Sequence, residues 1–265
     1  MEEQRQGGAA DSVGRGRSEG LPPLPDWLWW PVNAAQLMVT LAWSAAGICL
    51  ALLVRLLTGS DRIPLRMAAW MWSPVLLRGA GARLEVSGLD NVDFSRPCML
   101  VANHQSMIEV CALFSAVPVP LRFMLKDSLG RIPFLGAYTR AMGMILLRRG
   151  NPSEVARQLE RAADLLRDGH TLAAFPEGTR SRDGSVGPFK GGAFRAAIRA
   201  GVPVVPVAID GSGKVMPPGG FAIRPGRIHL AFGSPIATEN LGVGDRHVLA
   251  RRARAAVNEM KRRLD

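Results

Sequence analysis

The sequence predicts an α/β domain in which helices cover a β-sheet, preceded by an N-terminal helical segment that anchors the chain to a membrane. Two features support this prediction. From about Arg83 onward, short apolar runs alternate with stretches whose apolar residues recur at helical spacing. Ahead of them, residues 32–54 contain no charged side chain, and a helix of that length, about 35 Å, is long enough to cross a bilayer.

The chain divides into three segments. Residues 1–25 are rich in Gly, Ser, Pro and charge, so we expect a disordered tail. Residues 26–80 form the expected membrane-anchoring segment, with Trp27, Trp29 and Trp30 in the interfacial belt before the span. A buried helix of a soluble domain is the alternative. A second apolar patch, residues 67–77, is too short to span and suits a position along the interface. Residues 81–265 form the folded domain.

The order of strands and helices follows from the apolar pattern. The helical stretches are residues 104–116, 152–169 and 191–201, and the second has Pro152 near its start and Gly169 at its end. The final helix, from Gly244, carries an apolar stripe and many arginines, which fits either packing on the domain or a membrane-surface role. The runs expected to be strands are RLEVSG, CMLVA, LRFMLK, GMILLR, TLAAF, VPVVPVAI and RIHLAF.

Charge and cysteine content limit the possible functions. The formal net charge is +11, almost all of it from arginine, so partners are expected to be anionic. No nucleic-acid recognition module is present, and a nucleic-acid partner is not expected. The three cysteines show no paired spacing, so we expect neither a disulfide framework nor a metal site. Arginines follow the apolar segment more densely than they precede it. The domain should therefore be cytoplasmic, with the protein in the cell inner membrane or plasma membrane.

The stretch MLVANHQSMIEV, residues 99–110, contains the first candidate site. An apolar strand stops at Asn103 and His104, and Glu109 follows five residues after the histidine. On one continuous helix these two side chains would point about 140° apart. If His104 instead lies at a strand-to-helix turn, its ring can fold back toward Glu109. A carboxylate on one ring nitrogen fixes the tautomer and raises the basicity of the other, as general-base activation of a hydroxyl requires.

A second candidate loop, FPEGTRSRDG, directly follows the apolar strand TLAAF. Glu177, Gly178, Thr179 and Arg180 therefore lie at the end of a strand, where open α/β sheets bind their ligands. Gly178 supplies backbone freedom, and the planar guanidinium of Arg180 suits a phosphate group.

Together these stretches resemble the glycerolipid acyltransferase family, whose best-known members are lysophosphatidic acid acyltransferases. Four blocks occur in the family's order between about Arg83 and Phe232. NHQSMIE resembles the family's N-H-x-x-x-x-D block. KDSLGRIPFLG with GMILLRR resembles the second block, FPEGTRS matches the E-G-T-R block, and VPVVPVAI resembles the last. The resemblance implies a mixed sheet covered by helices.

The resemblance also implies a role for each candidate residue. His104 would deprotonate the free hydroxyl of a lysolipid, which attacks an acyl thioester of coenzyme A or of acyl carrier protein, and Glu109 would steady the histidine. Arg180 would hold the acceptor's phosphate on the loop formed with Glu177, Gly178 and Thr179. The other candidate phosphate contacts are Arg148, Lys126 and Lys190. No cofactor is implied, and nothing indicates the oligomeric state.

One departure from the family pattern keeps alternatives open, because the usual aspartate is Glu109 here. The default expectation is a membrane-bound enzyme that converts lysophosphatidate to phosphatidate. The alternatives are transfer to another lysolipid, such as lyso-ornithine lipid or a lysophospholipid, or a catalytically silent adaptor that binds lipid phosphate. A nucleotide site in DGSGK, residues 210–214, is not expected, because Ala208 stands where the first glycine of a P-loop should be.

Overall fold

The protein folds around one mixed seven-stranded sheet. The computed structural model describes residues 26–148 and 150–264, so the predicted disordered tail lies outside the described residues. The strand order is β1-β7-β6-β2-β5-β3-β4, and only the β6–β7 pair is antiparallel. All seven predicted strands are confirmed. Their bounds are β1 Ala82–Ser87, β2 Met99–Ala102, β3 Leu121–Lys126, β4 Ile145–Leu147, β5 Thr171–Ala174, β6 Val204–Asp210 and β7 Gly226–Phe232.

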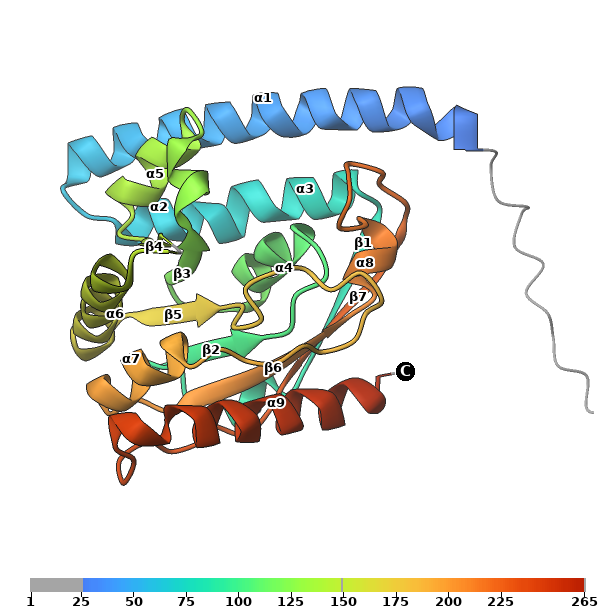
Figure 1. Ribbon diagram of the computed structural model, residues 1–265. Helices are drawn as coiled ribbons and strands as arrows, with labels where there is room; N and C mark the ends of the chain where they lie inside the picture. Colours follow the sequence, from blue (N-terminus) through green and yellow to red (C-terminus); the bar gives the residue numbers. More distant parts are fainter. Residues whose placement is uncertain (1–25, 149, 265) are drawn as a thin grey trace, which may run out of the picture.

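Helices cover both faces of this sheet, and α1 forms a further layer beyond one of them (Figure 1). The N-terminal helices are α1 Asp26–Thr58, α2 Arg62–Met67, the π-helical turn η1 Ala68–Trp72 and α3 Ser73–Gly79. The helices of the domain are η2 Leu89–Asn91, α4 Ile108–Ala116, η3 Asp127–Arg131, α5 Leu135–Ala141, α6 Pro152–Arg167, α7 Gly192–Ala200, α8 Ser212–Val215, η4 Val243–Asp245 and α9 Arg246–Arg262. The α/β class with a mixed sheet is therefore confirmed.

The central strands are apolar on both faces because helices bury both. Every residue of β2 and β5 is buried, which is why these runs are continuous rather than alternating. One cluster of buried residues packs β2 and β3 against α3 and α4. The other packs the opposite face of the sheet against α6, α7 and α9. This double cover fixes the carboxyl ends of the strands, where the candidate loops begin.

The ends of α6 follow the sequence signals. The side chain of Asn151 accepts a hydrogen bond from the Glu154 backbone N–H at 3.1 Å, and Pro152 occupies the first helical position. Beyond its last turn, Gly169 adopts φ 86°, a conformation that favours glycine.

The C-terminal helix α9 packs on the domain through its apolar stripe, including Leu249, Ala253 and Val257, all 0% exposed. It lies on the side of the sheet away from α1 (Figure 1). Of the two positions open for this helix, packing on the domain is the observed one.

Helix α1 lies along the domain over most of its length. Within the described chain it is the one helix long and apolar enough to cross a membrane, with mean hydropathy 2.3. The backbone N–H of Ile223 donates to Asn33 Oδ1 at 2.9 Å, and Trp72 Nε1 donates to Ser44 Oγ at 2.9 Å. These contacts lie about 16 Å apart along the helix at 1.5 Å per residue. They hold the domain against the side of α1.

Candidate active site

The two candidate loops meet at one edge of the sheet. His104 follows β2, residues 175–180 follow β5, and Lys126 ends β3. These three strands are parallel neighbours in the order β2-β5-β3. Their carboxyl ends therefore converge, and loops far apart in sequence form one site.

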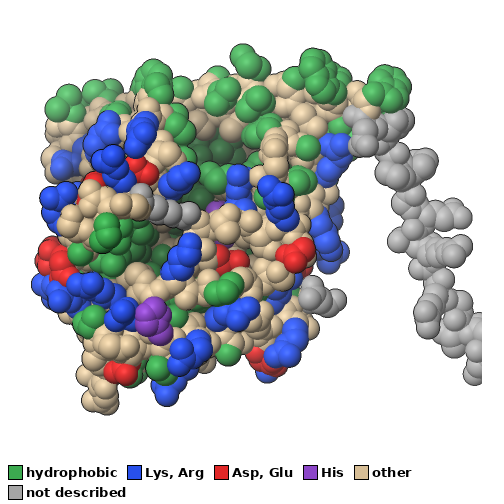
Figure 2. Space-filling view, viewed as in Figure 1, with side chains coloured by type: hydrophobic (Ala, Val, Ile, Leu, Met, Phe, Trp, Pro, Cys, Tyr) green, Lys and Arg blue, Asp and Glu red, His purple; other side chains and the backbone are tan. Residues whose placement is uncertain are grey.

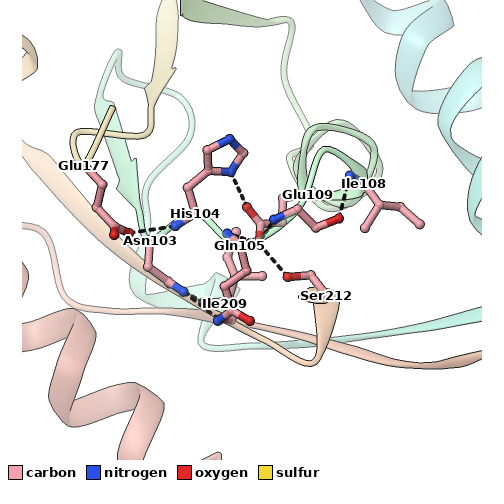
Figure 3. Close-up of polar contacts among 9 residues, drawn as sticks. Asn103, His104, Gln105, Ile108, Glu109, Glu177, Ile209 and Ser212 are labelled. Atoms are coloured by element: carbon pink, nitrogen blue, oxygen red, sulfur yellow. Dashed lines mark hydrogen bonds and ion pairs between the residues drawn. The ribbon is translucent and has the colours of Figure 1, made fainter. Parts of the chain in front are cut away.

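His104 and Glu109 form the dyad expected from their spacing. His104 lies in the turn after β2 and Glu109 lies in the first turn of α4, so the ring folds back over the helix start (Figure 3). Nδ1 of His104 is 2.6 Å from Glu109 Oε2. An ionised carboxylate accepts a hydrogen bond from Nδ1–H, which leaves the lone pair on Nε2, the nitrogen that points away from Glu109 (Figure 3). The ring is therefore oriented to act as a base.

The carboxylate of Glu109 is buried and held by several donors. Its side chain is 0% exposed, and its second oxygen, Oε1, accepts from the backbone N–H groups of Gln105 and Ser106 at 2.8 and 3.1 Å. The Ser212 hydroxyl donates to the same oxygen at 2.5 Å. A buried carboxylate needs such donors to remain charged. The longer side chain that departs from the family pattern thus has partners on both oxygens.

Glu177 ties the second loop to the first. Its Oε1 accepts from the His104 backbone N–H at 2.8 Å, and its Oε2 accepts from the Gly187 N–H at 2.9 Å. The backbone N–H of Ser181 donates to the His104 carbonyl at 2.7 Å. Burial raises the pKa of Glu177, while the two backbone donors act to lower it. Glu177 therefore positions the histidine through its backbone.

Asn103 fixes the end of the strand that carries the histidine. Its amide accepts from the backbone N–H of Ile209 at 2.7 Å and donates to the Ile209 carbonyl at 2.8 Å. Ile209 belongs to β6, the other neighbour of β2. Figure 3 shows this pair below the His104 and Glu109 side chains. The turn that bears His104 is thus bonded to both flanking strands or their loops.

Aromatic rings connect the histidine to an apolar cavity. The His104 ring stacks on Phe175 with centroids 4.0 Å apart, and Phe175 stacks on Phe123 at 6.3 Å. Phe123 lines a cavity between α1, α4 and α5. In Figure 2 the surface is hollowed below α1, with hydrophobic side chains inside the hollow and Lys and Arg side chains around it. The other lining residues are Gly47, Ile48, Ala51, Pro64, Met67, Ala68, Met71, Trp72, Val110, Phe114, Leu125, Leu135, Tyr138, Thr139 and Met144.

Some of the predicted cationic residues converge beside the second loop. Lys126 and Lys190 line a cleft together with Gly178, whose φ is 73°. Arg180 is partly exposed in the same loop and Thr179 is exposed. Arg148 is 3.9 Å from Glu154 at the start of α6, with its side chain 58% exposed. The structure therefore brings Lys126, Gly178 and Lys190 together, whereas Arg148 is paired with a carboxylate outside that cleft lining.

Sequence reasoning did not assign Ser212 to the site. This residue lies in DGSGK, residues 210–214, for which the sequence pattern predicts no site. A signal was present, because DGSGK follows a buried strand, as the two candidate loops do. The hydrogen bond joins residues more than 100 positions apart, so no local pattern reveals it.

Comparison with known proteins places the chain in a family. A family model described as Acyltransferase matches residues 83–210. A 1-acyl-sn-glycerol-3-phosphate acyltransferase of Pseudomonas aeruginosa is 35% identical over 195 residues, which cover 73% of this chain and 73% of that protein. A chloroplastic 1-acyl-sn-glycerol-3-phosphate acyltransferase of Brassica napus is 38% identical over 58% of this chain, but the match spans only 45% of that protein.

A solved structure agrees with these sequence matches. The crystal structure of the 1-acyl-sn-glycerophosphate acyltransferase PlsC from Thermotoga maritima superimposes with a TM-score of 0.74 at 25% identity, covering 87% of this chain and 95% of that chain. The fold and the matched domain are those of α/β proteins of the acyltransferase family. The chain belongs to the 1-acyl-sn-glycerol-3-phosphate acyltransferase family.

Proposed function

We propose that the protein transfers a fatty acyl group from an acyl thioester to the free hydroxyl of lysophosphatidate, giving phosphatidate. The observation that carries this proposal is the His104–Glu109 pair, 2.6 Å apart, beside an apolar cavity and a cleft with two lysines. The similarity to proteins named as 1-acyl-sn-glycerol-3-phosphate acyltransferases supports the choice of acceptor. Coenzyme A and acyl carrier protein are the two candidate carriers of the acyl group.

The reaction proceeds as one displacement. Nε2 of His104 takes the proton of the acceptor hydroxyl as its oxygen attacks the thioester carbonyl. The new C–O bond forms, the C–S bond breaks, and the imidazolium returns the proton to the leaving thiolate. Glu109 accepts hydrogen bonds from the Gln105 backbone N–H and the Ser212 hydroxyl, and its carboxylate stabilises the imidazolium between these steps. The net change is transfer of the acyl group with release of a free thiol.

The two parts of the substrate bind in different places, one in the cleft with the two lysines and the other in the apolar cavity. The phosphate of the acceptor binds in the cleft lined by Lys126, Gly178 and Lys190. Arg180, two residues after Gly178 in the same loop, supplies the planar fork that pairs with the phosphate charge. An acyl chain enters the cavity lined by Gly47, Phe123 and their neighbours. Thr179 shapes the exposed side of the loop. Arg148, paired with Glu154, contributes more weakly.

The membrane position follows from the same layout. Helix α1 covers the cavity, and only 6% of its most apolar 18-residue stretch is buried. We therefore expect the exposed apolar surface of α1 to contact lipid. We place the domain on the cytoplasmic side of the cell inner membrane or plasma membrane. An acyl chain that enters the cavity then need not cross water.

The test is product identification by mass spectrometry. Purified full-length protein is offered lysophosphatidate, a lysophospholipid and lyso-ornithine lipid, each with acyl-coenzyme A and with acyl carrier protein as donor. The expected product is phosphatidate, with much less product from the other two acceptors. A preference for lyso-ornithine lipid would move the assignment to that acceptor, and absence of every product would favour the silent adaptor, a reading that Glu109 first suggested.

A further inference from the structure

The turn between η3 and α5 exposes two large apolar side chains. Ile132 is 47% exposed and Phe134 is 55% exposed, and Pro133 lies between them. Single exposed apolar residues are common on protein surfaces and need no explanation. Two of them in one turn indicate a contact surface only if other structural features of the turn support the same conclusion.

The backbone of this turn is strained at Phe134. Among the described residues Phe134 is the one non-glycine residue with positive φ, at 61°, and its ψ is −55°. The Leu135 N–H donates to the Pro133 carbonyl at 2.6 Å. These values define a γ-turn of the rare, strained kind. Strain of this type persists only where the surroundings impose it, and it often marks a functional position.

The surroundings of the turn do impose it. The Gly136 N–H donates to the Ile132 carbonyl at 2.8 Å, and Arg140 Nη1 donates to the Gly130 carbonyl at 2.8 Å. A Cβ on Gly136 would lie 2.1 Å from the Gly130 oxygen, so only glycine allows the two backbone segments to approach so closely. These contacts hold the chain on both sides of the turn, while Ile132 and Phe134 stay exposed.

The tip lies beside the apolar helix and the acyl cavity. Leu135, the next residue, lines that cavity together with Gly47 and Ala51 of α1. Figure 1 shows α5 beside the C-terminal half of α1. The last turns of α1 expose Leu56 at 80% and Leu57 at 75%. The Ile132–Phe134 turn therefore lies next to α1, which has an exposed apolar surface of its own.

We propose that the Ile132–Phe134 turn is a membrane wedge, which inserts Phe134 and Ile132 into the acyl layer of the bilayer beside the cavity. Arg131, whose side chain is 72% exposed and pairs with Asp127, and Arg140, also exposed, flank the turn and supply positive charge for anionic headgroups. The inserted wedge holds the cavity wall formed by Leu135 against lipid. It rests on the membrane position proposed above but not on the reaction chemistry.

A fluorescent probe at the tip tests this proposal without reference to catalysis. Full-length protein with Cys49→Ser and Phe134→Cys is labelled with an environment-sensitive dye and bound to vesicles of phosphatidylcholine and phosphatidylglycerol. Burial raises the pKa of the Cys98 and Cys111 thiols to about 12, so these two should stay unlabelled. The control places the cysteine at Val248 of α9, which is 37% exposed on the other side of the sheet.

The dye at position 134 should shift to shorter wavelength and be quenched by nitroxides on lipid acyl chains but not by aqueous iodide. The dye at position 248 should show the opposite pattern. Iodide quenching at both positions would overturn the wedge, and it would leave the proposed reaction untouched because no turnover is measured. As a second test, Phe134→Asp should lower turnover at vesicles at least about tenfold and leave turnover of a soluble short-chain lysophosphatidate near wild type. Equal turnover at vesicles would also count against the wedge.

Discussion

Replacing Glu109 with glutamine changes one atom of the site but should invert the histidine tautomer. Three donors, the backbone N–H groups of Gln105 and Ser106 and the hydroxyl of Ser212, converge on Oε1. The amide oxygen of glutamine must therefore take that side, and its NH₂ group must face Nδ1 of His104. Nδ1 then has to accept, so the proton moves to Nε2 and the base is blocked.

The magnitude follows from the bonds that are lost. A hydrogen bond to a charged group contributes about 1.5–3 kcal/mol, which corresponds to a factor of about 10 to 150 in rate. The wrong tautomer adds to this loss, and a comparable carboxylate-to-amide change in a serine protease triad lowers kcat about 10⁴-fold. We therefore expect Glu109→Gln to lower kcat by about 10² to 10⁴.

The assay is release of free thiol from the acyl donor at saturating lysophosphatidate, with nitrogen NMR of the histidine ring as a direct readout of the tautomer. Ser212→Ala removes one donor but leaves the charge and the tautomer, so its kcat should fall only about tenfold. Glu160→Gln on α6 is the matched control for loss of a carboxylate. A folded Glu109→Gln protein that keeps more than a tenth of wild-type kcat would refute this reasoning.

The remaining predictions concern the acceptor, the dyad length and the membrane. Arg180→Lys should raise the KM for lysophosphatidate at least about tenfold while the donor KM changes little, with Arg251→Lys on α9 as control; an unchanged acceptor KM would remove Arg180 from the phosphate site. Glu109→Asp keeps the charge but shortens the side chain, so its kcat should lie between those of wild type and Glu109→Gln, and a loss as large as for Gln would mean that one methylene decides the dyad. Protease protection in intact cells should place tags at both chain ends on the cytoplasmic side if α1 lies in the interface, whereas tags on opposite sides would establish the span predicted from residues 32–54.

The central strands could be predicted because they bury both faces. Continuous apolar runs such as those of β2 and β5 can only be covered on both sides. The dyad could also be predicted, since the sequence places a polar turn at the end of β2. The position of α1 could not be predicted. Its residues are apolar nearly all round, so no periodic stripe indicates which side packs on the domain.

The supporting residues of the site were the least predictable. Ser212 contacts Glu109, and Ile209 contacts Asn103, only because β6 lies beside β2. The order of strands in a sheet is a tertiary property, which the local sequence does not reveal. The strained Phe134 turn depends on the close approach of Gly130 and Gly136. Each glycine is visible in the sequence, but their contact is not.

The most direct test of the central claim is the rate of acyl transfer by His104→Ala. Thiol release and phosphatidate formation are followed together in vesicles. The control is His170→Ala, because His170 lies just before the amino end of β5, whereas the candidate site lies at the carboxyl ends of the strands. If His104 is the general base, its removal should lower both rates by about 10² to 10⁴, while His170→Ala stays near wild type. Near-normal transfer by a folded His104→Ala protein would contradict the proposed mechanism.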